Sequence, residues 1–397
     1  MKLRADTLIL KTQLLVTAGI VVAQALGRDL IASLLFTLTF VLTVCLWLTV
    51  AERRIGRINI LAIMIVIVSC ISVAVNALVT NTIVSFSYIK KLIMFWSTVL
   101  FFATMSEYRP ERSVVHFAFR LNTFLTIFLI VIYFVQNSQM HLWNNRVTIY
   151  LTFRFTNPNL TAVFLSAICM IEMICAAVSR KRLSKTMHAG LAVFMVLFVF
   201  ETRARNAQLL LVFFIAVYMV MVLFPRVKLR MTRGMAALIA TFPLLFAIGY
   251  MLLIYTPVVQ KLFEFLAGAG KDLDSRVGIW TIAFEAFASS PLFGAYSQIV
   301  NSTTHSQLHN THMDVMASYG VIVLIILCFF LYCILRQVNM KNHGRMNMIC
   351  LVGFSALLLT GIGEAMIFSG GLGVYILVGI LLMLVNFDFA EEGKLIK

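Results

Sequence analysis

Residues 321–335 read VIVLIILCFFLYCIL, fifteen consecutive apolar positions without a single charge. With the residues before them they form an apolar run near 313–335, and about 20 residues suffice for a helix to cross the hydrocarbon core of a bilayer. The chain as a whole has the same character: 61% of its residues are hydrophobic and 12% are charged, and its mean hydropathy is +0.97. This balance is typical of a polytopic membrane protein and excludes a soluble globular domain.

Apolar runs of similar length occupy the rest of the chain. They fall near 7–27, 31–51, 58–80, 89–107, 117–136, 158–178, 186–201, 206–224, 235–255, 347–366 and 372–388. The seventh run along the chain is short, and the first contains Lys11. Because only a helix satisfies its own backbone hydrogen bonds in lipid, the pattern predicts one all-α integral membrane domain over residues 1–397. It would have about 12 transmembrane helices.

The distribution of Lys and Arg predicts how the chain is oriented. With a cytoplasmic N-terminus, the inner segments carry 20 of the 32 Lys and Arg residues, the outer segments carry 10, and Lys11 and Arg120 lie within runs. Positive residues favour the cytoplasmic side, so both termini are expected there. The net charge of +16 then reflects topology and does not indicate a nucleic-acid partner. All seven cysteines lie in apolar runs, so no disulfide framework is predicted.

One long connection, residues 256–312 between the ninth and tenth runs, is predicted to lie outside. A long loop among short ones is where function is most expected. Apolar residues recur in it at helical spacing: Ile279, Trp280, Ala283, Ala286 and Phe287. We expect an amphipathic helix from Asp274, with Asp274 or Ser275 as its cap, ending before Pro291. Arg276 lies in its first turn, beside backbone N–H groups that favour anions.

A second cluster of charge, Glu201, Arg203 and Arg205, lies at the outer edge between the seventh and eighth runs. Guanidinium groups make bidentate contacts to phosphate, so Arg203 and Arg276 would suit a diphosphate at the membrane boundary. The alternative is that Arg203 extends to the lipid head groups and that Arg205 pairs with Glu201.

Four segments resemble the O-antigen ligase and polymerase superfamily of bacterial surface-glycan enzymes. They are Thr156-Asn-Pro-Asn159, Thr202-Arg-Ala-Arg205, Ser275-Arg-Val-Gly-Ile-Trp280 through Ser290-Pro-Leu-Phe-Gly294, and His309-Asn310 followed by Gly320. The resemblance covers roughly residues 150–335. One departure is that Arg205 is an additional arginine after the Thr202-Arg203-Ala204 that fits the family pattern.

The resemblance implies an inverting, metal-independent glycosyltransferase that uses an undecaprenyl-diphosphate-linked glycan on the outer face of the bacterial inner membrane. Arg203 and Arg276 would stabilise the leaving diphosphate. His309 would be the general base for the acceptor hydroxyl, since histidine titrates near neutral pH. The remaining substrate-binding candidates are Arg205, Arg154, Asn310, which would orient the base or a sugar, and Glu364, which would orient Arg203 or hold acceptor sugar.

The same residues leave polymerase and ligase open. A polymerase passes the growing chain to another lipid-linked repeat, whereas a ligase passes it to lipid A-core or another acceptor. The Asn157-Pro-Asn159 segment favours a polymerase of O-antigen, capsule or exopolysaccharide. The expected partners are the lipid-linked donor, a glycan or lipid-linked acceptor, membrane lipid, and a chain-length regulator or flippase of the same pathway; no cofactor is expected.

Three other interpretations are less favoured. His305, His309 and His312 have spacing compatible with zinc, but only His309 fits the family pattern, so no metal site is predicted. Asp272-Leu-Asp274 has the form of a nucleotide-sugar metal motif but is better explained as a helix cap. Twelve spans with Glu52-Arg-Arg-Ile-Gly-Arg57 also fit a transporter or glycan flippase, although the loop 225–233 lacks the counterpart that such a transporter would carry.

Overall fold

The computed structural model describes the chain in segments. They are residues 4–51, 56–81, 84, 86–135, 140–142, 149–155, 157–224, 226–227, 229–253, 256–257, 261, 274–295, 308–341, 344–364, 366–369 and 373–389. Within them, eleven helices are long and apolar enough to cross a membrane. The first six are α1 (Ala5–Ala25), α2 (Asp29–Ala51), α3 (Arg57–Thr80), α4 (Phe86–Glu107), α5 (Arg112–Val135) and α6 (Pro158–Val178). The other five are α7 (Arg182–Glu201), α8 (Arg205–Leu223), α9 (Arg233–Leu253), α13 (Thr311–Lys341) and α14 (Arg345–Leu359).

The all-α membrane architecture predicted from the sequence is confirmed. Each of the first eleven predicted runs falls on one of these candidate spans. The largest difference is at the end of α14, which ends at Leu359 and not at 366. The twelfth run coincides with α16 (Val374–Val385), a helix of 12 residues. A short hairpin of β1 (Met140–Leu142) and β2 (Ile149–Leu151) is the β structure in the described segments.

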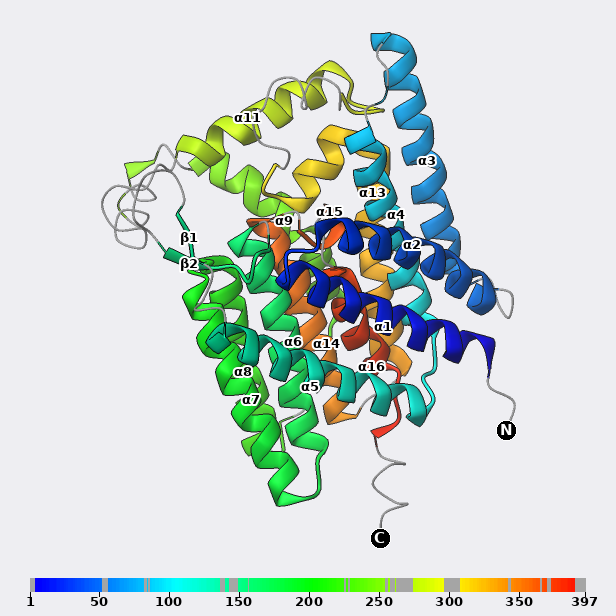
Figure 1. Ribbon diagram of the computed structural model, residues 1–397. Helices are drawn as coiled ribbons and strands as arrows, with labels where there is room; N and C mark the ends of the chain where they lie inside the picture. The colour runs from blue at the N-terminus through cyan, green and yellow to red at the C-terminus, as the bar shows by residue number, and fades with distance from the viewer. Residues whose placement is uncertain are drawn as a thin grey trace.

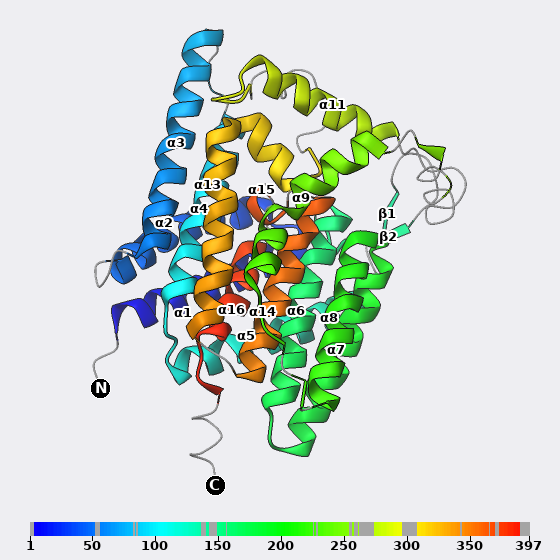
Figure 2. The same cartoon turned by 180° about the vertical axis from the view of Figure 1, so that it is seen from behind.

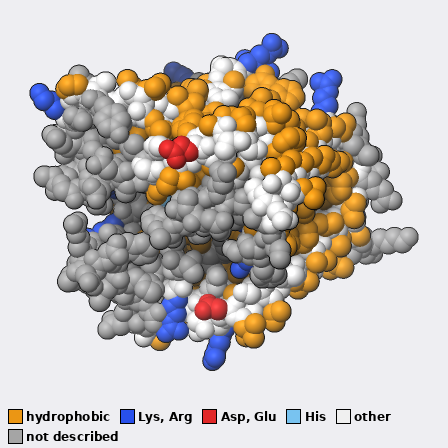
Figure 3. All heavy atoms as spheres, turned by 90° about the horizontal axis from the view of Figure 1, so that it is seen from above, with side chains coloured by type: hydrophobic (Ala, Val, Ile, Leu, Met, Phe, Trp, Pro, Cys, Tyr) orange, Lys and Arg blue, Asp and Glu red, His pale blue; other side chains and the backbone are white. Residues whose placement is uncertain are grey.

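The shortness of α16 follows from its position at the centre of the bundle (Figures 1 and 2). All of its residues are buried, and it packs against α4, α6 and α14. The helices around it instead expose large apolar side chains, among them Leu30 at 75%, Leu78 at 81% and Leu209 at 70%. Figure 3 shows hydrophobic side chains gathered over a broad area of the surface. Such a surface fits lipid as the surrounding solvent.

The long connection between the ninth and tenth spans contains α11 (Asp274–Ser289), which lies across one end of the bundle (Figure 1). The helix buries Trp280, Ala283 and Ala286, the face that its apolar spacing predicts. The side chains of the proposed caps, Asp274 and Ser275, are not among those that the structure describes, and neither is Asp272.

After α11 the chain docks onto a break in α13. At Gly320, with φ of 85° and ψ of 177°, α13 divides into two helical pieces. There Val321 N donates to Pro291 O at 2.9 Å, and Ala295 N donates to Ala317 O at 2.9 Å. A side chain at Gly320 would meet the backbone of Leu292. The Ser290-Pro-Leu-Phe-Gly294 motif therefore packs directly against the backbone at Gly320.

Candidate functional site

The centre of the candidate site is a buried carboxylate, Glu364, with two polar partners. Glu364 is 4% exposed, and its Oε2 lies 3.0 Å from Nδ1 of His309. Its Oε1 accepts a hydrogen bond from Nδ2 of Asn159. The His309 side chain keeps 24% of its surface exposed. Glu364 in the segment after α14 is therefore met by Asn159 from the start of α6 and by His309, two residues before α13.

His309 is positioned by its neighbour Asn310, which is fully buried. Asn310 Oδ1 accepts from the backbone N–H groups of His312 and Met313, both at 3.0 Å, and so caps α13. Its Nδ2 donates to Pro243 O at 2.8 Å and to Ile362 O at 3.1 Å. These four bonds use the whole hydrogen-bonding capacity of the amide. Asn310 thus fixes the segment that carries His309, and it has no amide atom left for a sugar.

Glu364 lies outside any helix, beyond the short 3₁₀ turn η1 (Thr360–Ile362) that ends α14. Thr360 O accepts from the backbone N–H groups of Gly363 and Glu364, both at 3.2 Å. The same carbonyl accepts from Asn206 Nδ2 at 2.8 Å. Asn206 belongs to the first turn of α8 and follows Arg203 by three residues. Through this contact the turn that carries Arg203 is tied to the segment that carries Glu364.

Arg203 lies in the tight turn between α7 and α8, and its side chain is exposed. Thr202 shapes the turn: its Oγ1 donates to Val199 O at 2.7 Å and accepts from Ala204 N at 3.3 Å. Glu201 accepts from the Tyr133 hydroxyl at 3.1 Å. Arg205 begins α8 and is also exposed. The structure therefore presents two guanidinium groups at this corner and gives Glu201 a phenol as partner.

Arg154 lies in the segment that leads into α6. Its Nη1 would be 2.7 Å from a side chain at Gly27, in the α1–α2 turn, so the guanidinium packs on that glycine. The ring of Phe153 meets that of Phe198 in α7, with centroids 5.5 Å apart. Asn157 caps α6 by accepting from Asn159 N at 2.7 Å. Arg154 and Asn159 therefore enter the same end of the bundle as the Arg203 turn; Thr156 is outside the described residues.

The loop helix α11 is anchored directly beside His309. Trp280 is 1% exposed, and its indole N–H donates to Leu308 O, the residue before His309, at 2.9 Å. Its ring also packs edge-on against Tyr250 of α9, with centroids 5.4 Å apart. Arg276 precedes Trp280 by about one helical turn. The Arg276 side chain lies outside the described residues, so its role stays a prediction.

Three of the predicted site residues have an unusual backbone conformation. Arg154, Arg203 and His309 have φ of 61°, 56° and 50°, in the left-handed region. In the described segments two other non-glycine residues share it, Asn81 and Phe153. This conformation costs a non-glycine residue about 1–3 kcal/mol, and such residues cluster at functional sites. Three of the site residues predicted from the sequence are thus strained positions.

A protein-family model matches the part of the chain that contains several of these site residues. Residues 190–328 match the family model for O-antigen ligase. This match over about a third of the chain supports membership of the O-antigen ligase and polymerase superfamily. The matched region contains the Arg203 turn, α11 and His309, whereas Asn159 and Glu364 lie outside it. Members of this family are glycosyltransferase-like enzymes of lipid-linked glycans. No curated protein matches the chain.

For a glycosyltransferase-like enzyme, the important feature is the carboxylate on one ring nitrogen of a part-exposed histidine. A carboxylate at Nδ1 favours the tautomer in which that nitrogen carries the proton, which leaves Nε2 as an acceptor. An acceptor nitrogen can take the proton of a sugar hydroxyl. The assignment of the tautomer is inferred from the hydrogen bond.

Sequence reasoning missed two contacts here. Asn159 was recognised only as part of the Asn-Pro-Asn motif, although its position in the first turn of a capped helix places it beside Glu364. The sequence gives no sign of the pair between Lys91 of α4 and Asp314 of α13. Lys91 Nζ lies 2.6 Å from Asp314 Oδ1, and both side chains are at most 13% exposed. The zinc alternative is not supported by the described residues: His312 Nε2 pairs with Ala240 O at 2.8 Å. His305 is outside them.

Proposed function

We propose that the chain transfers a glycan from an undecaprenyl-diphosphate-linked donor to a sugar hydroxyl, and that it acts as a polymerase of lipid-linked repeats. The observation that carries the proposal is the Glu364–His309 pair beside the strained Arg203 turn. A base and a diphosphate-binding cation at one end of a membrane bundle suit a lipid-linked donor, because its diphosphate lies at the membrane boundary.

In the proposed reaction the acceptor hydroxyl oxygen attacks the anomeric carbon and inverts it. The bond between that carbon and the diphosphate oxygen breaks, and His309 Nε2 takes the hydroxyl proton. The diphosphate leaves with the bonding electrons, and Arg203 and Arg276 stabilise its charge. Such stabilisation by fixed cations in a water-poor site is usually the largest catalytic contribution. No metal ion is needed for this sequence of events.

The supporting residues follow from the contacts. Glu364 orients His309, and Asn159 holds Glu364 in turn. Of the two roles expected for Asn310, orienting the base or a sugar, its hydrogen bonds within the protein favour the first. Arg205 and Arg154 are assigned to donor or acceptor binding because both are exposed at the same end. An outward-facing site with cytoplasmic termini places the reaction where lipid-linked repeats are presented.

The family name favours a ligase as the second candidate, so the test must separate the two activities. Purified protein in lipid is given a defined undecaprenyl-diphosphate-linked repeat and no other acceptor. A ladder of lengthening products establishes the polymerase. Product that forms only after lipid A-core or another acceptor is added makes the chain a ligase. Movement of the donor across the bilayer without any product contradicts the proposal and indicates a flippase.

A further inference from the structure

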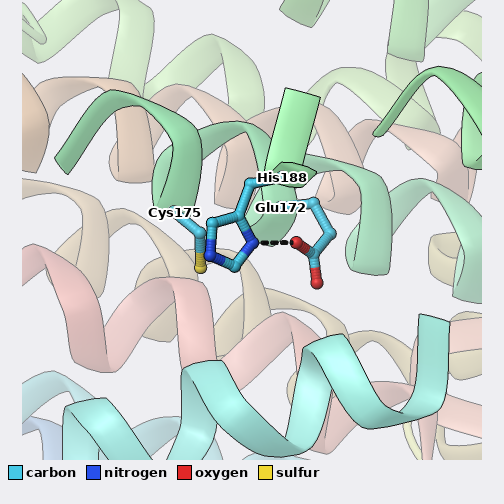
Figure 4. A group of neighbouring side chains, drawn as sticks. All are labelled: Glu172, Cys175 and His188. Carbon is cyan, nitrogen blue, oxygen red and sulfur yellow. Dashed lines mark hydrogen bonds and ion pairs between the residues drawn. The ribbon is translucent and has the colours of Figure 1, made fainter. Parts of the chain in front are cut away.

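A second buried carboxylate lies in the bundle far from the proposed reaction. Glu172 and Cys175 belong to α6 and His188 belongs to α7, and their side chains face one another (Figure 4). Glu172 is fully buried, Cys175 is 2% exposed and the His188 side chain is 13% exposed. Along α6, Glu172 is about 20 Å from Asn159. The cluster lies outside the family-matched region and takes no part in the proposed transfer.

The three residues supply the atoms of a transition-metal site. One carboxylate oxygen, the Cys175 sulfur and one ring nitrogen of His188 all lie within 4.8 Å of one another. Carboxylate, thiolate and imidazole are the donor types that zinc takes in proteins, and three protein donors with one further position make a four-coordinate site. Among the described residues this is the group with that composition.

The surroundings of Glu172 match those of a metal-binding carboxylate. Its Oε1 accepts from Asn122 Nδ2 at 2.8 Å, Thr123 Oγ1 at 3.1 Å and Thr126 Oγ1 at 3.2 Å. These bonds from α5 fix the carboxylate and direct Oε2 at His188, whose Nδ1 lies 2.7 Å away. Metal-binding carboxylates are held by outer hydrogen bonds in the same way.

An unpaired oxygen of Asn122 and the charge balance of the cluster also favour a metal ion. Asn122 is 2% exposed, and among the residues that the structure describes its Oδ1 has no hydrogen-bond partner, although buried polar atoms are normally paired. The same amide holds Glu172 through its Nδ2, so the unpaired oxygen belongs to a direct neighbour of the cluster. A divalent ion with the carboxylate, the thiolate and a neutral imidazole also has zero net charge. Neutrality matters because an uncompensated charge inside a membrane bundle is expensive.

We propose that Glu172, Cys175 and His188 bind a divalent transition-metal ion of the zinc type, which ties α6 to α7. Binding displaces the thiol proton of Cys175 and the proton shared by His188 and Glu172, and both leave to solvent. The ion would have a structural role: α6 carries Asn159 at its far end, and α7 leads into the Arg203 turn. It would take no part in glycosyl transfer.

The test uses the full-length protein in lipid, stripped of metal and titrated with Co²⁺. We expect one Co²⁺ per chain, with a thiolate-to-cobalt charge-transfer absorption in the near ultraviolet that Zn²⁺ abolishes by competition. Cys175→Ser should lose this absorption. Cys169→Ser is the matched control, because Cys169 is a buried cysteine on the same helix and should leave the absorption intact. Glu172→Gln should weaken Co²⁺ binding at least tenfold.

A folding defect in Cys175→Ser would not hide the answer. A second variant keeps Cys175 and replaces the other six cysteines with serine, and it should show the same absorption as the wild type. Absence of a thiolate-to-cobalt absorption in the wild type overturns the proposal, and so does an unchanged absorption in Cys175→Ser. In either case the cluster is a hydrogen-bonded Glu–His pair that joins α5, α6 and α7 without an ion.

Discussion

Replacing Glu364 with Gln tests the proposed catalytic pair most directly. The substitution keeps the size of the side chain but replaces one carboxylate oxygen with an NH₂ group. Oε2 of Glu364 lies 3.0 Å from His309 Nδ1, and Oε1 accepts from Asn159 Nδ2. If the new NH₂ group faces His309, Nδ1 must become an acceptor and the ring proton moves to Nε2, where it blocks the base. If the new NH₂ group faces Asn159 instead, it meets the NH₂ group of Asn159, and the hydrogen bond between the two side chains is lost.

The size of the effect can be worked from these contacts. A hydrogen bond to a charged group contributes about 1.5–3 kcal/mol, so its loss alone corresponds to about 10- to 150-fold in rate. Removal of a general base costs about 10²–10⁴-fold. Since the wrong tautomer removes the base, we expect kcat to fall by about 10²–10⁴-fold for Glu364→Gln. The KM for the donor should change little, because the diphosphate is assigned to the arginines.

The assay is transfer from the lipid-linked donor by purified protein in lipid, with kcat and KM measured separately. Glu201→Gln is the matched control: it removes a carboxylate near Arg203, but that carboxylate is exposed and accepts from Tyr133. We expect the control to stay within a few-fold of the wild type. Glu364→Gln with a kcat within threefold of the wild type would refute the argument that this carboxylate sets the tautomer of His309.

Three further predictions follow from the site and the fold. His309→Ala should abolish transfer while the protein elutes from size exclusion as the wild type does; residual turnover above a hundredth of wild type would remove the base assignment. Arg203→Lys should reduce kcat by about 10- to 150-fold, because a lysine cannot make the bidentate phosphate contact and loses one charge-assisted hydrogen bond; wild-type kcat would remove Arg203 from the donor site. Gly320→Ala should lower the free energy of unfolding by about 2 kcal/mol or more, because its side chain would meet the backbone of Leu292 at a φ of 85°. Thermal unfolding in lipid checks this, with Gly249→Ala as the control that should be neutral or stabilising, since no atom of the described residues lies within 4 Å of a side chain there; equal shifts in the two variants would contradict it.

Hydropathy predicted the spans well because membrane burial acts on each run independently. The match extends to the short seventh run, which the structure lengthens to Arg182–Glu201 by including polar residues at its N-terminal end. The eleventh run was wrong in one respect that matters. Residues 347–366 are mostly apolar and carry no charge except Glu364, which suggests one helix, yet α14 ends at Leu359 and Glu364 lies in a non-helical segment. Gly361 and Gly363 were the available signals.

The polar partners within the site were harder to predict, because they come from elements distant in sequence. Nothing in spacing relates Glu364 to His309, which is 55 positions earlier, or to Asn159, which is 205 positions earlier. The sequence alone therefore allows two roles for Glu364, orienting Arg203 or holding acceptor sugar. Asn310 was assigned to orienting the base or a sugar, and its four hydrogen bonds support only the first. Tertiary packing decides such pairs, and local pattern carries no information on it.

The left-handed backbone at Arg154, Arg203 and His309 has a consequence for how this enzyme can be engineered. Glycine and asparagine accept that conformation more easily than arginine or histidine do. A variant library selected for thermal stability alone should therefore enrich glycine or asparagine at these positions and lose transfer activity as it does so. Stability and catalysis oppose each other here at single residues. A thermostable version of the protein has to gain its stability elsewhere, in positions such as the helix interior around Gly249.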